Sequence, residues 1–118
     1  MDESKDFLNA WKQALGLLKY TGHFKLFGVL NSEQVKEASS LNDIRPVYEL
    51  FAKELVSVSS SERVYLLSLY SFYNRSDTEY LARAVDSATP SMGTVAAFFA
   101  GCPELEALTN LMQTYRGW

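Results

Sequence analysis

Signals that begin and end helices recur along this chain, and they restrict its fold more than any other feature. The tetrapeptides SSSE at 59–62 and SDTE at 76–79 have the spacing of a capping box. In a capping box, a serine hydroxyl and a glutamate side chain each bond to a free backbone amide at the start of a helix. Thr89 followed by Pro90 suits a cap and a first helical position, and Pro103 suits a first helical position too. The chain is therefore predicted to be a series of short helices.

Between these signals, the apolar residues recur at the spacing of a helix. The segment NDIRP adds another start, with Asn42 or Asp43 as the cap and Pro46 inside the first turn, while Gly22 and Gly101 suit helix ends. We predict an all-α fold in one domain of 118 residues, with about six to eight short helices packed as antiparallel hairpins in a bundle-like arrangement. The predicted helices cover residues 3–21, 23–30, 32–40, 43–57, 60–74, 77–88, 90–100 and 103–115.

The segment RVYLLSLYSFYNR at 63–75 is apolar around nearly the whole circumference of a helix. Only Ser68, Ser71 and Arg75 form a narrow polar line along it. A helix of this kind usually lies at the centre of a fold, so we predict a core helix with close neighbours at the small serines. The alternative is a tyrosine-rich surface for a partner, because tyrosine is enriched at interfaces.

Composition and charge argue against several classes of function. A net charge of −3 does not favour nucleic-acid binding, which needs clustered lysine and arginine. The N-terminal residues MDESKDFLNAWK lack the apolar segment of a signal peptide, and no apolar run approaches the ~20 residues that cross a membrane. With Cys102 as the only cysteine, no disulfide can form within the chain. We therefore expect a cytoplasmic protein without membrane association.

Two residues, Cys102 and His23, are the candidates for chemistry. Cys102 lies at a predicted helix N-terminus, where the partial positive charge lowers a thiol pKa, so a thiol-dependent enzyme or sensor is one hypothesis. The interpretation that we prefer is a small buried apolar residue. His23 is the only histidine and has no spaced partner for a metal, so we predict no metal site. The sequence has no Gly-rich phosphate loop, nucleophile elbow or HExxH pattern, so we also predict no cofactor and no enzymatic activity.

The segment TVAAFFAGCPELEALTNLM at 94–112 resembles a helix-turn-helix, with Gly101 at the turn. Its second helix would carry Glu104 and Glu106, and it has no lysine or arginine before Arg116. Acidic side chains there would repel phosphates, so DNA binding, like the thiol hypothesis, is one of the less favoured alternatives.

Several features favour binding to another protein. Lysines recur every seven residues in the first predicted helix, beside an apolar stripe that includes Trp11. This pattern is typical of a helix that packs against a partner, and also of a helix whose lysine face is in solvent. The terminal QTYRGW contains residue types common in binding hot spots, and its tryptophan either folds back onto the core or stays free for a partner. The predicted contact residues are Trp11, Tyr73, Tyr115, Arg116 and Trp118.

The function predicted from these features is a non-enzymatic protein–protein interaction module. It would act as an adaptor, a chaperone-like factor or an inhibitory regulator, and its partner would be another protein or its own copy in a homodimer. The alternative from a different class is an apolar small-molecule binder in which the aromatic helix at 63–75 lines a cavity.

Overall fold

The computed structural model describes residues 3–118 and confirms the all-α prediction: this part of the chain has seven α-helices and no strand. Three short 3-10 helices lie between them. The α-helices are α1 Glu3–Gly16, α2 Ser32–Glu37, α3 Tyr48–Glu54, α4 Ser60–Tyr73, α5 Arg75–Ala84, α6 Met92–Phe99 and α7 Pro103–Thr114. The 3-10 helices are η1 Leu17–Tyr20, η2 His23–Phe27 and η3 Leu41–Ile44.

Several of the predicted helix ends are confirmed. The Ser59 side chain accepts a hydrogen bond from the Glu62 amide and so caps α4. Pro103 is the first residue of α7, and Gly22 adopts the left-handed conformation, with φ +78°, immediately after the first helical segment. Glu62 does not complete the capping box, because its carboxylate bonds to His23 instead.

Two predicted starts are wrong by a few residues. Helix α5 begins at Arg75 and is capped by Asn74, whose side chain accepts from the Asp77 amide, so the predicted Ser76 cap lies inside the helix. Helix α6 is capped by Ser91 rather than Thr89. Asn and Ser are about equally good caps and Thr is a somewhat weaker one, so each pair offers two local candidates.

The predicted helix over 43–57 is divided by Pro46, which does not lie in a first helical turn. Its ring disfavours the helical conformation of the residue before it, and Arg45 is extended with ψ 153°. The chain therefore forms η3, leaves the helical conformation, and enters α3 only at Tyr48. The predicted first helix, 3–21, ends earlier as an α-helix at Gly16 and tightens into η1.

Helix α4 is the central helix, as predicted. Six consecutive residues of it, 65–70, are buried. Ser68 and Ser71 satisfy their hydroxyl hydrogens on the carbonyls of Val64 and Ser68 in the same helix. Tyr65 and Tyr70 of this segment are buried in the core, whereas Tyr73 is half-buried.

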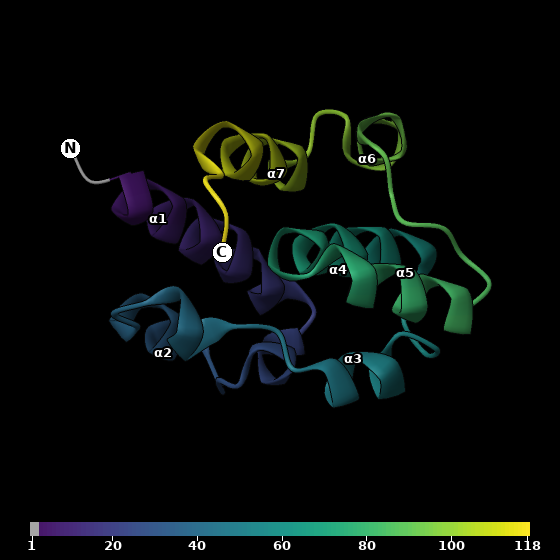
Figure 1. Ribbon diagram of the computed structural model, residues 1–118, viewed down its shortest axis with the longest axis horizontal. Coiled ribbons are helices and arrows are strands. Elements are labelled where there is room, and N and C mark those ends of the chain that lie inside the picture. The colour runs from purple at the N-terminus through teal and green to yellow at the C-terminus, as the bar shows by residue number, and fades with distance from the viewer. Residues whose placement is uncertain (1–2) are drawn as a thin grey trace.

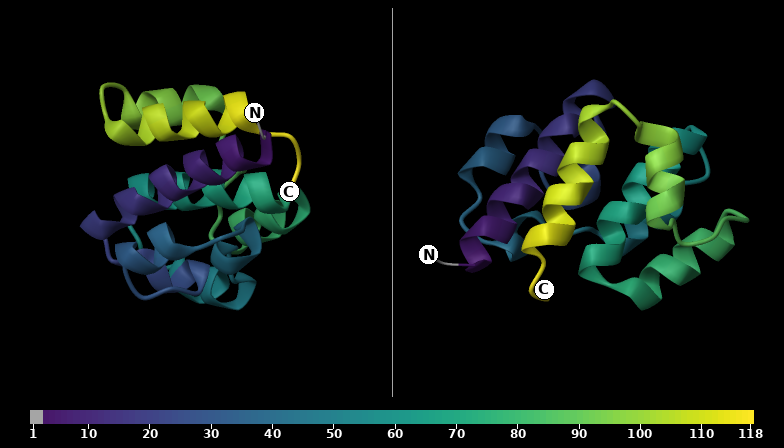
Figure 2. Two further views of the ribbon diagram at one scale, coloured as in Figure 1. Left: turned by 90° about the vertical axis from the view of Figure 1, so that its left-hand side faces the viewer. Right: turned by 90° about the horizontal axis from the view of Figure 1, so that it is seen from above.

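The helices form three layers (Figure 1). Helices α6 and α7 make one outer layer, α1, α4 and α5 the middle layer, and α2 and α3 with the 3-10 helices the other outer layer. Helices α1 and α7 lie side by side in opposite directions, whereas α7 and α4 run in the same direction (Figure 2).

Candidate functional site

The structure brings together four of the five predicted contact residues in one aromatic cluster. The Trp118 ring lies 4.9 Å from the Trp11 ring and 5.0 Å from the Tyr73 ring, measured between centroids. Tyr115 joins them through Phe7, at 5.5 Å. The C-terminal segment thus folds back against α1 and α4 instead of standing free, while Arg116 stays exposed and donates to the Tyr115 carbonyl.

Most of this cluster faces inward. Trp11 has no exposed surface, and its Nε1 donates to the Ile44 carbonyl at 2.9 Å. Trp11 therefore cannot touch a partner in this conformation, because the apolar stripe of α1 is used for the core of its own chain. Trp118 and Tyr73 are half-buried, whereas Tyr115 is 41% exposed. Whether these residues bind a partner stays a prediction.

Beside Tyr115 lies a cavity of about 420 Å³ between α4, α6 and α7, which we call the α4–α6–α7 groove. Its volume is within the range of about 300–1,000 Å³ that ligand sites occupy. The lining residues are Ser68, Ser71, Phe72, Arg75, Pro90, Ser91, Met92, Val95, Leu108, Met112 and Tyr115. The polar line of residues 68, 71 and 75 that the sequence indicated forms one wall.

The surface of this groove is apolar and partly exposed. Met92 is 42% exposed and Met112 48%, and these are two of the three methionines in the protein. Methionine is flexible and polarisable, so it adapts to partners of different shape. Beneath them, Val95 and Leu108 are buried and form the floor.

The adjoining chain carries no charge over a long stretch. Residues 87–103, which include all of α6, contain no Asp, Glu, Lys or Arg. Phe98, on the same helix, is 44% exposed. Interfaces are depleted of charge at their centre, so this segment has the composition of an interface core.

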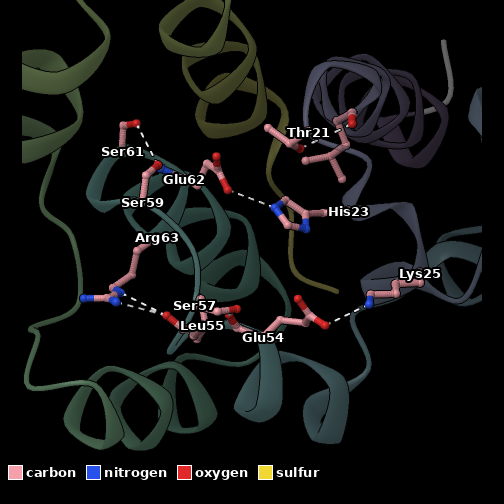
Figure 3. Close-up of polar contacts among 11 residues, drawn as sticks. Thr21, His23, Lys25, Glu54, Leu55, Ser57, Ser59, Ser61, Glu62 and Arg63 are labelled. Atoms are coloured by element: carbon pink, nitrogen blue, oxygen red, sulfur yellow. Dashed lines mark hydrogen bonds and ion pairs between the residues drawn. The ribbon is translucent and has the colours of Figure 1, made fainter.

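A second, smaller cavity of about 230 Å³ contains His23, Glu62 and Glu104. His23 Nε2 lies 2.9 Å from Glu62 Oε2 and joins η2 to α4 (Figure 3). Nearby, Lys25 bonds to Glu54 at 2.8 Å and holds the pKa of that carboxyl below its usual range. The sequence did not reveal these pairs, because their members are 39 and 29 residues apart.

The hydroxyl groups near His23 bond elsewhere. Ser61 lines the same cavity, but it points away from the His23 ring toward Ser59 (Figure 3). Burial raises the pKa of Tyr65, and Glu104 adds to the shift, so that hydroxyl stays protonated and donates to the Ala14 carbonyl at 2.6 Å. Within residues 3–118 no hydroxyl or thiol is hydrogen-bonded to the His23 ring.

Cys102 caps α7 by position and is exposed, so the prediction that it is a buried apolar residue is wrong. It is not among the residues that line the cavity at His23. The described part of the chain holds no group of three or more possible metal ligands, and none of its helices is long and apolar enough to cross a membrane.

The helix-turn-helix resemblance places α7 as the reading helix, but α7 packs against α1. Ala107, Leu108 and Leu111 are buried, and the Asn110 amide donates to Gln13 of α1 at 3.0 Å. The helix contains no lysine or arginine.

Fold and cavities together define an all-α protein with an open apolar groove on one outer layer. Comparison with protein-family models finds no match, and neither curated proteins nor solved structures yield a significant match.

Proposed function

We propose that this protein is a non-enzymatic interaction module that binds a partner protein in the α4–α6–α7 groove. The observation that supports this proposal is the exposure of Met92, Met112 and Tyr115 around one apolar groove beside an uncharged helix. Tyrosine and methionine are enriched in the buried centres of interfaces. An adaptor, a chaperone-like factor or an inhibitory regulator would all work in this way.

In this proposal the protein acts in the cytoplasm, and its partner is either another protein or a second copy of the chain. The single exposed thiol of Cys102 supports a reducing compartment, because exposed free cysteines oxidise elsewhere.

The test is quantitative affinity capture from the native host with charge placed in the groove. The double variant Met92→Glu/Met112→Glu should lose the captured partner, because each carboxylate would be desolvated against Val95 and Leu108. The matched control is Leu30→Glu/Val56→Glu, since both residues are exposed apolar side chains outside the groove. A partner that is retained by the groove variant and lost by the control would refute the proposal.

The second candidate function is an apolar small-molecule binder, and the groove volume of about 420 Å³ supports it. Four residues from the segment 63–75 line the groove, which agrees with that alternative. Native mass spectrometry separates the two functions. A co-purifying small molecule that is absent from the Met92→Glu/Met112→Glu variant would favour the ligand binder over the interaction module.

A further inference from the structure

The α4–α6–α7 groove carries one charged side chain, that of Arg75. None of the other lining residues is ionisable at neutral pH. Within residues 3–118 Arg75 forms no ion pair, although Glu79 lies four residues further along α5. A cation also opposes the helix dipole at the first position of a helix, which Arg75 occupies in α5. Helix stability therefore does not explain this arginine.

The serines that line the groove have hydrogen-bond partners within the chain, which leaves Arg75 and the Tyr115 hydroxyl as donors for an anion. The hydroxyl hydrogens of Ser68 and Ser71 are donated to carbonyls within α4, and the Ser91 oxygen accepts from the Thr94 amide. Arg75 has five N–H donors and no acceptor, so its complement is a carboxylate or another anion.

The shape of the groove suits a short helix. Ser68 and Phe72 line it from α4, with Arg75 just beyond at the start of α5. Leu108 and Met112 line it from α7, with Tyr115 just beyond the end of that helix. On each helix these lining residues lie four positions apart, which is about 6 Å at the helical rise, or about one turn of a third helix. The two walls run in the same direction, and the start of α6 borders them (Figure 2).

We propose that the occupant of this groove is an amphipathic helix of a partner protein, with apolar side chains for Met92 and Met112 and a carboxylate opposite Arg75. This inference rests on the proposed function and adds the chemistry of the partner. Helices bind in apolar grooves through side chains at i, i+3 or i+4, and i+7, and a flanking charge fixes their register.

The experiment is selection of a displayed library of helix-forming peptides with randomised positions against the wild-type protein. Peptides that bind the groove should carry apolar residues at helical spacing with Asp or Glu beside them. Selection against Arg75→Glu should enrich Lys or Arg at the same place. The matched control is Arg83→Glu, an exposed arginine on the same helix outside the groove, and it should leave the acidic preference unchanged.

The affinity of one selected peptide for each variant measures how much Arg75 contributes to binding. Arg75→Ala should weaken binding about threefold, as expected for an exposed ion pair, and Arg75→Glu should weaken it about tenfold because attraction becomes repulsion. Met92→Glu/Met112→Glu should abolish binding.

Any of four outcomes would overturn the inference. Groove-binding peptides without an acidic preference would remove the charge argument and leave the interaction module intact. Self-association of the wild-type protein that is lost in the groove variant would make a second copy the occupant. Dodecanoate binding that depends on Arg75, with no selected peptide competing, would replace the helix by a fatty acid. If no selected peptide binds the groove, and affinity capture also fails, both proposals fall.

Discussion

The two tryptophans allow a matched test of core energetics, because replacing each by phenylalanine should have different effects. Trp11 is fully buried and its Nε1 bonds to the Ile44 carbonyl. The Trp118 Nε1 is also buried, but within residues 3–118 it has no acceptor. Trp11→Phe thus removes a satisfied donor, whereas Trp118→Phe removes an unsatisfied one.

The magnitudes follow from these contacts. Trp11→Phe leaves the Ile44 carbonyl desolvated, at about 1–3 kcal/mol, and opens a small cavity, at about 1–2 kcal/mol. We expect its free energy of unfolding to fall by about 2–5 kcal/mol. Trp118→Phe also loses ring contacts, but relief of the buried N–H offsets that loss, so the change should stay within about 1 kcal/mol.

The assay is urea denaturation followed by far-UV circular dichroism, with exposed Tyr80→Phe as a control. The slope of the free energy against urea should be unchanged, so that the midpoint alone reports stability. If Trp118→Phe is as destabilising as Trp11→Phe, the reasoning about the two indole groups is refuted.

Three further predictions concern a cap, a carboxylate and the thiol. Asn74→Ala should cost about 1 kcal/mol in urea denaturation, whereas Ser76→Ala should cost less than about 0.5 kcal/mol; the reverse order would contradict the observed start of α5. Hydrogen bonds from Ser39, then from the Ser40 amide, lower the pKa of Asp43, so its stabilisation is present above the usual carboxyl range and is lost as pH falls through the lowered pKa. The difference in urea midpoint between the wild type and Asp43→Asn should therefore shrink on acidification below about pH 4, and a constant difference would argue against it. Iodoacetamide should alkylate exposed Cys102 in the folded protein, and protection until unfolding would contradict its placement.

Features that depend on local sequence were predictable from it. Ser59 and Pro103 start helices because their effects act within one turn, and the apolar circumference of 63–75 places α4 in the core. Where two local signals compete, as at Asn74 and Ser76, the sequence alone does not select between them. The extended conformation of Arg45 follows from the restriction that proline imposes on the residue before it, a local effect that outweighs the helical spacing of the apolar residues around Pro46.

The groove was not predictable, because it depends on how far α6 covers α4 and α7. Met92 and Met112 lie on different helices, and nothing in their spacing shows that they flank one cavity. The sequence showed Arg75 as part of a polar line. Only the packing of the helices shows that it is the one charged residue that lines the groove. Residue type alone predicted both Tyr115 and Trp11 as partner contacts. Tyr115 lines the groove, whereas Trp11 is buried in the core.

The antiparallel contact between α1 and α7 has a consequence for the order of folding. The bond from Asn110 to Gln13 joins residues 97 positions apart, and closing a flexible loop of that length costs about 4 kcal/mol in entropy. During synthesis, the apolar side of α1 has no α7 to cover it until nearly all of this chain has left the ribosome. We expect nascent chains to collapse without native packing until then, so that removing α7 would leave a remainder prone to aggregation rather than a smaller folded protein.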